Sequence, residues 1–299
     1  MPTDKTLRLP SYGGQAVMEG VLMRGRRNVA MAVRAPSGEI ETYEEKLPSL
    51  YQSRWMKIPF IRGVISLWDS LNLGTRFLMK SANMASGEEE QIGGAALAGT
   101  VAMSLLLGVG IFFLLPAFLA GLTEKYLSIS SWWSNLLEGV FRLLILVIYL
   151  VLMGRVPEIQ RVFSYHGAEH KTINAFESGV ELTPEEVAKQ TLVHPRCGTS
   201  FILTLVLLSV LIFSLLGPLP IHWRLISRIL MLPLVSAIAY EYIRFAANWM
   251  DKSMLVRWLI QPNLWLQKLT TREPSRDMLE VSITAFNLMI KAENSPSEV

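Results

Sequence analysis

The sequence has little cysteine and little net charge, and each shortage removes a class of protein. A single cysteine, Cys197, among 299 residues excludes an internal disulfide framework and leaves that thiol as a metal ligand or an inert core residue. The formal net charge is only +3 and no segment concentrates basic residues on one face, so no nucleic-acid partner is expected. Residues 1–10 are polar and lack the apolar stretch of a cleavable signal peptide, so the first apolar helix is expected to direct membrane insertion itself.

Apolar residues, by contrast, are abundant and clustered. They make up 51% of the chain, and the mean hydropathy of +0.34 is high for a soluble globular protein. A helix needs ~20 apolar residues to cross a bilayer, and four runs are of about that length. These runs are residues 91–123, Ser134–Met153, Thr199–Leu216 and Leu225–Tyr240. The pattern therefore predicts an α-helical polytopic membrane protein with about four transmembrane helices and a small cytoplasmic N-terminal α+β region.

The few ionisable residues in these runs are expected near the ends of the helices. Glu138 and Arg142 are four apart with the acid first, the order that favours an ion pair on one helix. We expect Arg224 and Arg228 to extend toward the membrane surface at the start of the fourth run, as long basic side chains at helix ends do. Because a transport pathway would place charges near the middle of the membrane, this distribution argues against a transporter.

Basic residues are unevenly divided between the segments that flank the four runs. Residues 1–91, 154–199 and 244–299 together carry 24 of the 28 lysines and arginines. By the positive-inside rule, both termini and the 154–199 loop face the cytoplasm in a multi-pass protein of the inner membrane. The chain is thus expected to divide into a cytoplasmic region (1–90), a four-helix membrane domain (91–243) that carries the loop, and a cytoplasmic amphipathic helical tail.

The soluble segments contain both strand and helix patterns. Asn28–Ala35 and Glu39–Leu47 flank a Pro-Ser-Gly turn and predict a β-hairpin, to which Gln15–Arg24 could add a strand. Ile61–Met84 has helical periodicity, which suits either an interfacial helix on the membrane or a helix packed on the strands. Tryptophans recur over Trp249–Trp265, where an interfacial helix is also expected.

One segment has the composition of a metal site. His166, Glu169 and His170 form the pattern H-x-x-E-H, which is the reversed order of the zincin motif. On a helix the two histidines lie one turn apart on the same face, so both imidazoles can reach one ion. Glu169 follows the first histidine by three residues and can act as general base without being a ligand, because a bound metal would acidify the water from which it takes a proton.

A second segment offers further ligands. His194 and Cys197 are three apart around a proline, immediately before the third apolar run, so the candidate metal ligands are His166, His170, His194 and Cys197, for a divalent cation that is expected to be zinc. The competing interpretation is that the histidines are ordinary polar residues of a cytosolic helix and that the thiol is a small buried apolar group. Gly167 weakens a regular helix by ~1 kcal/mol relative to alanine. It therefore either lets another segment approach the backbone closely or indicates that the motif is partly loop.

Four segments resemble the bacterial YqhQ-like membrane proteins. They begin at Gly13, Tyr165, His194 and Thr270 and read GGQAVMEGVLMRG, YHGAEHK, HPRCGTSF and TTREP. The resemblance covers nearly the whole chain, and it implies a domain of unknown function that is labelled a predicted metal-dependent enzyme. The residues that it carries over are Glu19, His166, Glu169, His170, His194, Cys197, Arg272 and Glu273.

Two hypotheses for function remain open, and both have the lipid bilayer as a partner. In the first, the protein is a metal-dependent hydrolase at the cytoplasmic membrane face, with Glu169 as general base and a peptide or a lipid-linked molecule as substrate. In the second, it is a non-enzymatic membrane scaffold or regulator with a structural metal. The difference lies in whether Cys197 closes the ligand shell or leaves a position open for water.

Overall fold

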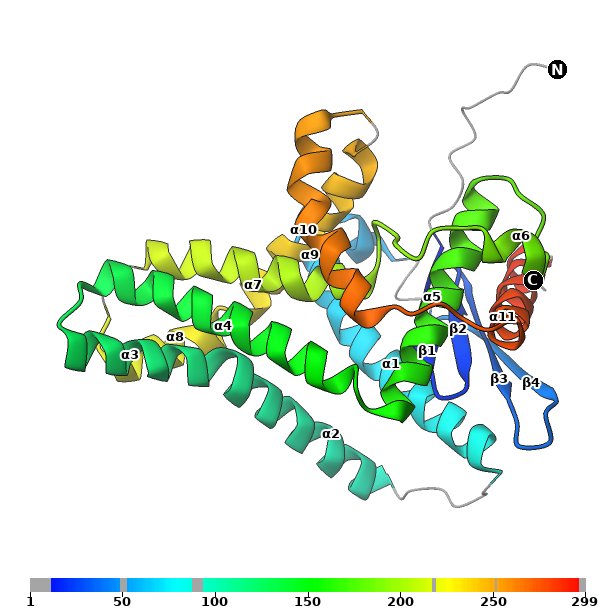
Figure 1. Ribbon diagram of the computed structural model, residues 1–299, viewed down its shortest axis with the longest axis horizontal. Helices are drawn as coiled ribbons and strands as arrows, with labels where there is room; N and C mark the ends of the chain where they lie inside the picture. The colour runs from blue at the N-terminus through cyan, green and yellow to red at the C-terminus, as the bar shows by residue number, and fades with distance from the viewer. Residues whose placement is uncertain (1–11, 49–52, 88–93, 217–218, 251, 296–299) are drawn as a thin grey trace.

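A computed structural model describes most of the chain, in the ranges 12–48, 53–87, 94–216, 219–250 and 252–295. The expectations for residues 1–10 and for the first residues of the apolar run at 91 lie outside these ranges. The described chain is mostly helical with a small antiparallel sheet near its N-terminus, as the sequence predicts. Figure 1 shows the sheet and the helices around it at one end of the molecule and the long apolar helices at the other.

The sheet is a four-stranded antiparallel meander. Its strands, which are neighbours in sequence order, are β1 (Gly13–Val17), β2 (Gly20–Arg24), β3 (Asn28–Arg34) and β4 (Ile40–Lys46). The predicted hairpin is β3–β4. The sequence predicts one additional strand in the segment Gln15–Arg24, but the segment contains parts of two, because Val17 pairs with Gly20 across a two-residue turn. Glu19 in that turn has φ 50°, the left-handed conformation that tight hairpin turns require.

Helices cover both faces of the sheet. They are α1 (Ile61–Ser86) on one face, and α5 (Pro157–Glu177) and α11 (Arg276–Asn294) on the other. Alternation along β2 determines which side chain enters which layer, since Leu22 packs with Phe77 of α1 whereas Val21 and Met23 pack with Tyr165 of α5. The predicted helix over residues 61–84 is therefore packed on the strands, while its outer face leaves Trp68 72% exposed.

The body around the sheet is assembled from segments that are far apart in the chain. The N-terminal strands, the helix that follows α4 and the C-terminal helix share one core. Two short helices, η2 (Arg54–Lys57) and α6 (Pro184–Ala188), lie in the connections. The loop that carries the candidate ligands is consequently packed against the sheet, and residues near both ends of the sequence surround it.

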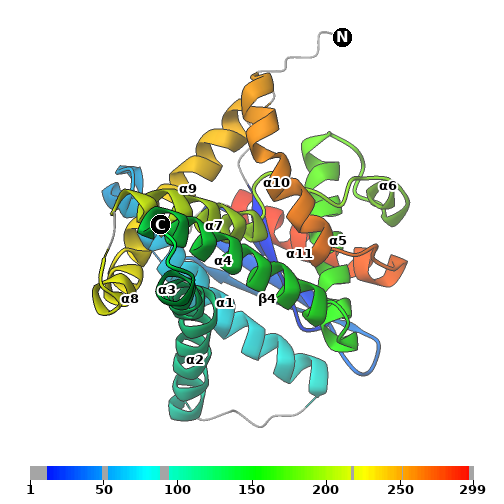
Figure 2. The same cartoon turned by 60° about the vertical axis from the view of Figure 1, so that its left-hand side comes forward.

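All four apolar runs form helices. They are α2 (Gly94–Val109), the π-helical turn η3 (Gly110–Leu114), α3 (Leu115–Leu127), α4 (Ser131–Met153), α7 (Gly198–Leu215), α8 (Ile221–Leu230) and α9 (Leu232–Trp249). In the described chain, the stretches Ala98–Leu127 and Trp132–Met153 are long and apolar enough to cross a membrane, the bent pair α8–α9 gives a third candidate, and α7 is apolar but shorter. Figure 2 shows α3, α4, α7 and α8 grouped into one bundle.

The fourth run differs from its prediction as a single helix. α8 and α9 are bent by 48° relative to each other, with the break at Met231. Pro233 lies in the first turn of α9, where its missing N–H and fixed φ are tolerated. In the middle of a continuous helix the same proline would remove the hydrogen bond to Ile229, so the helix ends and restarts there.

The tryptophan-rich segment forms α10 (Met254–Thr270), which packs on α7 and α9. Its buried face includes Ile260 and Gln267, while Leu255 and Trp258 are 69% and 68% exposed. In Figure 1, α10 crosses the direction of the bundle helices rather than following it.

Candidate metal centre

The H-x-x-E-H pattern lies within α5. Pro157 in the first turn and Glu158 beside it favour a helix start, because proline needs no N–H partner there and an acid complements the helix dipole. The helix continues without interruption to Glu177, so the alternative of a partly looped motif is wrong. The rings of His166 and His170 are adjacent, with centroids 4.4 Å apart.

Cys197 completes a group of three donors. It lies in the turn before α7, where its N–H donates to the carbonyl of His194. Its Sγ is 3.1 Å from Nε2 of His166, and the ligand atoms of His166, His170 and Cys197 all lie within 4.8 Å of one another. Zinc bonds of ~2.0–2.3 Å at tetrahedral angles separate donors by about 3–4 Å. The three side chains are therefore close to the spacing that one cation needs.

Backbone carbonyls orient both imidazole rings. Nδ1 of His166 is 2.9 Å from the carbonyl oxygen of Thr270, and Nδ1 of His170 is 2.6 Å from that of Leu192. Because a carbonyl can only accept, Nδ1 carries the proton in each ring and Nε2 keeps its lone pair. This arrangement, in which the outer nitrogen is bonded to a carbonyl, is typical of metal-binding histidines.

The Nε2 atom of His170 tests whether these residues suit a metal. His170 is 1% exposed, and its Nε2 is buried without a hydrogen-bond partner in the described chain. An unsatisfied buried nitrogen costs about 1–3 kcal/mol. A cation among the three donors would remove that penalty, so the donor set fits a bound metal.

Glu169 lies on the sheet side of this group. It is 5% exposed and packs against the backbone of Gly14 in β1, where a side chain on the glycine would collide with the carboxyl group. Burial raises the pKa of Glu169 to about 7, against the opposing effects of nearby His166 and of the Gly14 N–H, which donates to the carboxylate. A carboxyl group with a pKa near neutrality can both accept and release a proton at physiological pH.

His194 lies beside the group of three but has other partners. Its ring centroid is 5.9 Å from that of His170, and its Nε2 is 3.4 Å from a carboxylate oxygen of Glu177. Burial lowers the pKa of His194, while the Glu177 carboxylate opposes that shift. Gln267 fixes the backbone of His194 through hydrogen bonds to both its N–H and its carbonyl. In this arrangement His194 borders the centre rather than facing it.

Glu19, which the resemblance also carries over, lies in the β1–β2 turn. Both of its carboxylate oxygens accept hydrogen bonds from Arg161, and one is 3.3 Å from the hydroxyl of Tyr165. The Arg161 guanidinium lowers the pKa of Glu19. The carboxylate therefore joins the hairpin turn to α5 and is not among the grouped donors.

Arg272 and Glu273 hold the segment between α10 and α11 against α5. Arg272 forms structural hydrogen bonds: its backbone N–H donates to the carbonyl of Phe163, and its Nη2 donates to the carbonyl of Gly154. Glu273 forms an ion pair with the buried amine of Lys171. These contacts position the carbonyl of Thr270 that orients His166.

Gly167 permits this close approach. A Cβ at this position would overlap the carbonyl oxygen of Arg272 and would come within 2.9 Å of a methyl group of Leu192. The interpretation that Gly167 lets another segment approach the backbone is therefore confirmed.

Replacing Gly167 with alanine is expected to destabilise the protein by about 1–3 kcal/mol, because a backbone segment must move to admit the methyl group. Chemical or thermal unfolding of Gly167→Ala beside wild type measures this. Gly179→Ala is not a suitable control because Gly179 has φ 69°, so Gly198→Ala, which meets no atom within 4 Å, serves instead. Equal stability of the Gly167 and Gly198 variants would contradict the prediction.

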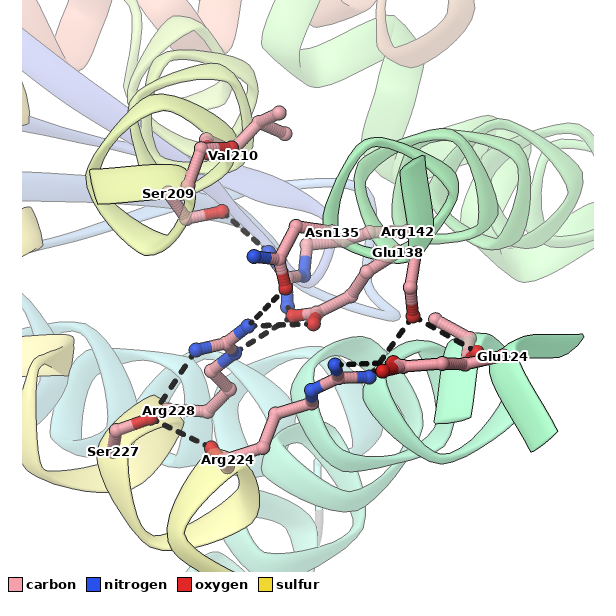
Figure 3. A network of polar contacts seen from close by, with 12 residues as sticks. Glu124, Asn135, Glu138, Arg142, Ser209, Val210, Arg224, Ser227 and Arg228 are labelled. Carbon is pink, nitrogen blue, oxygen red and sulfur yellow. Dashed lines mark hydrogen bonds and ion pairs between the residues drawn. The ribbon is translucent and has the colours of Figure 1, made fainter. Parts of the chain in front are cut away.

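A second constellation, which the sequence did not predict, lies inside the helical bundle. Glu138 accepts hydrogen bonds from Arg142, as expected for the i,i+4 pair, and also from Arg228 of α8 at 2.7 and 2.8 Å (Figure 3). The three residues are at most 1% exposed. Arg142 also donates to Ser209 of α7, so the network joins α4, α7 and α8.

Neighbouring polar groups extend the network (Figure 3). Arg224 donates to Ser134 at 3.0 Å and to Glu124 at 2.7 Å. Nε of Arg142 donates to the carbonyl of Phe112, four residues before Pro116, which has no N–H of its own to offer. Arginine side chains thus bind both carboxylates and backbone oxygen in the bundle.

The expectation that Arg224 and Arg228 extend to the surface is wrong. They are 2% and 1% exposed, because Arg228 pairs with the buried Glu138 and Arg224 is bound by Ser134 and Glu124. Arg142 is likewise halfway along the Trp132–Met153 stretch rather than at its end. The spacing of these residues offered one sequence signal. Arg224 and Arg228 are four residues apart, so both side chains lie on the same face of α8.

Comparisons with known proteins identify relatives without a described activity. A family model described as "Protein of unknown function (DUF1385)" matches residues 58–292. An uncharacterized protein of Bacillus subtilis (strain 168), YqhQ, is 34% identical over 301 residues, which cover 95% of this chain and 93% of that protein. No solved structure is detectably similar to the chain.

Proposed function

The chain belongs to the DUF1385 family of proteins of unknown function, and from the geometry of its site we propose that it is a membrane-embedded, metal-dependent hydrolase. The family relationship read from four sequence motifs is thereby confirmed. Membrane insertion, the metal and the reaction are proposals that depend on the observations below.

The membrane proposal has three supports. Two or three helices meet the length and composition of a span. The bundle exposes large apolar side chains, among them Leu106 at 69% and Leu211 at 64%, which a lipid environment would cover. In Figure 1, α2–α3 and α7 run away from the sheet while α4 and α8–α9 return toward it. We propose four crossings of the bacterial inner membrane, with the sheet and both termini in the cytoplasm.

The metal proposal depends above all on the orientation of two rings. His166 and His170 each donate Nδ1–H to a carbonyl, and their Nε2 atoms lie in one group with the Cys197 thiol. Nitrogen and sulfur donors in this ratio suit zinc best among common divalent cations. We propose His166, His170 and Cys197 as the ligands, with His194 as a neighbour that could become a fourth. A cation held there would supply Lewis acidity toward a carbonyl or phosphoryl oxygen and toward water.

Glu169 is the proposed general base. It is three residues from His166 on the same helix, and the Gly14 N–H holds its carboxyl group in place. In that role its carboxylate would accept a proton from the attacking water and return that proton to the leaving group. The substrate classes remain a peptide or a lipid-linked molecule, because the site would lie at the membrane surface.

Burial of the donors favours a second candidate function. His170 and Cys197 are 1% and 6% exposed. A metal bound there would join α5 of the cytoplasmic body to α7 of the bundle, which is the role of a structural site. The protein would then be a membrane scaffold or regulator.

The variant Glu169→Gln distinguishes the two functions. Removal of a general base is expected to reduce the reaction by about 10²–10⁴-fold while leaving the ligands intact. Complementation of a deletion strain and hydrolysis of chromogenic ester and peptide substrates would be measured together with metal content. Glu158→Gln, an exposed acid of the same helix, is the matched control. If Glu169→Gln performs as wild type, the hydrolase hypothesis fails and the scaffold hypothesis stands.

A further inference from the structure

A shallow groove lies between the first half of α5 and the segment that joins α10 to α11. It has a volume of about 630 Å³. One wall consists of four residues that recur every three or four positions and so share one face of α5: Pro157, Gln160, Arg161 and Ser164. The opposite wall includes residues 271–273. The groove has a volume within the usual range for small-molecule sites, ~300–1,000 Å³.

The groove lies next to the end of α4. Met153 is the last residue of that helix, and the groove begins four residues later at Pro157. Arg272, which lines the opposite wall, donates to the carbonyl of Gly154 directly after α4. If α4 crosses the membrane, the groove lies where the helix leaves the hydrocarbon region, at the depth of lipid headgroups.

The charges of the lining favour an anion. Glu273, the one acid among the lining residues, is neutralised by Lys171, and Arg161 is paired with Glu19. Arg272 is exposed and has no carboxylate partner within the described ranges. Guanidinium groups form paired hydrogen bonds with phosphate oxygens, and the amide of Gln160 adds a further donor on the facing wall.

The groove shares its walls with the candidate metal centre. Leu192 lines the groove, and its carbonyl accepts the Nδ1 proton of His170. Thr271 also lines it, and the carbonyl of the preceding Thr270 accepts the Nδ1 proton of His166. A ligand in the groove would therefore be separated from the two histidines only by the backbone segments whose carbonyls orient their rings.

From these observations we propose that the groove binds the phosphate-bearing headgroup of an anionic membrane lipid, with Arg272 as the main contact. This assignment rests on the proposed function, and it names the substrate class of that site as a phosphate-bearing lipid rather than a peptide. Pro157, Leu192 and Met278 provide the apolar part of the lining, which suits the glycerol or isoprenoid carbons next to a phosphate.

The test is a binding titration with the purified full-length chain in detergent. The probes are short-chain phosphatidylglycerol, short-chain phosphatidylcholine and inorganic phosphate. Wild type is expected to bind phosphatidylglycerol saturably and at least about tenfold more tightly than the other two probes. The reason is that phosphatidylcholine lacks the net negative charge and inorganic phosphate lacks the lipid carbons. Equal affinity for inorganic phosphate would overturn the lipid assignment, and absence of saturable binding would overturn the site.

Two variants localise the binding. Arg272→Gln is expected to weaken phosphatidylglycerol binding by about tenfold or more, because a charged hydrogen-bond donor is lost. Ser164→Glu places a negative charge in the groove without removing the Arg272 anchor to Gly154, and it should weaken binding to a similar extent. Arg155→Gln removes an exposed charge at the same level but outside the lining and is the matched control. Variants that bind like the control would overturn the proposal.

Metal content measured on the same samples separates this proposal from the proposed function. Ser164→Glu should retain metal, because Ser164 is not one of the three proposed metal ligands and its hydroxyl donates to the carbonyl of Gln160, away from them. If wild type binds the lipid but no metal, the proposed hydrolase fails while the groove stands as a lipid site. If wild type binds metal but no lipid, the groove proposal alone fails.

Discussion

Glu138→Ala is expected to reduce the stability of the helical bundle by about 3–5 kcal/mol, because it leaves buried charges without a partner. Glu138 is 1% exposed and accepts hydrogen bonds from both Arg142 and Arg228. Without it, two guanidinium groups remain inside the bundle beside Phe213, whose ring they already contact at 5.2 and 4.3 Å. An uncompensated buried charge is costly, so the loss of stability should lie at the upper end of the range for single substitutions.

Thermal unfolding in detergent, followed by tryptophan fluorescence or circular dichroism, measures the effect. Glu181→Ala, which removes an exposed acid outside the bundle, is the matched control and should be nearly neutral. The double variant Glu138→Ala with Arg228→Met should recover part of the loss, since one of the two unpaired charges is gone. A single variant as stable as the control would show that the network does not hold the helices together.

His170→Ala is expected to abolish metal binding. His170 is one of the three grouped ligands, and its buried Nε2 has no hydrogen-bond partner in the described chain. Alanine offers no atom that could bind the cation in its place. Structural zinc contributes ~10–16 kcal/mol of binding free energy in small domains, so loss of a ligand should also lower the thermal midpoint measured with metal present.

Metal analysis of protein purified without chelators provides the measurement. His222→Ala is the control, because His222 lies in α8 at the other end of the bundle and is exposed. Cys197→Ala should behave like His170→Ala. His194→Ala should weaken binding by about 10–100-fold if His194 only supports the ligands, as expected for an outer partner. Wild-type protein without metal, or an unchanged metal content in His170→Ala, would refute the metal centre.

Part of the candidate site could be predicted from spacing alone. The four-residue interval between His166 and His170 places both rings on one face of any helix, and α5 is a helix throughout. The partners of their Nδ1 atoms could not be predicted, because Leu192 and Thr270 are remote in sequence and approach only through packing. The contact between Glu169 and Gly14 likewise depends on the sheet lying against α5.

The positions of the charged residues in the bundle could not be predicted from local sequence. Local rules assigned Arg224 and Arg228 to the surface because long basic side chains at helix ends normally reach water. The structure buries both, since Glu124 and Glu138 lie on neighbouring helices at matching heights. A rule based on neighbouring residues contains no information about a partner from another segment, so the buried polar network of the bundle cannot be predicted from it.

The sequence by itself determined the order of apolar and polar segments, the helical character of the apolar runs, the hairpin β3–β4 and the one-turn interval of the two histidines. These properties depend on hydrophobic periodicity, turn chemistry and helix geometry, which act over a few residues. Only the tertiary structure decided that three distant segments share one core around the sheet, that Cys197 rather than His194 completes the donor group, and that four charged residues are buried in the bundle. The physical reason is that the burial and pairing of polar groups depend on which remote segments pack beside them. That packing is determined by the whole chain and not by the local sequence.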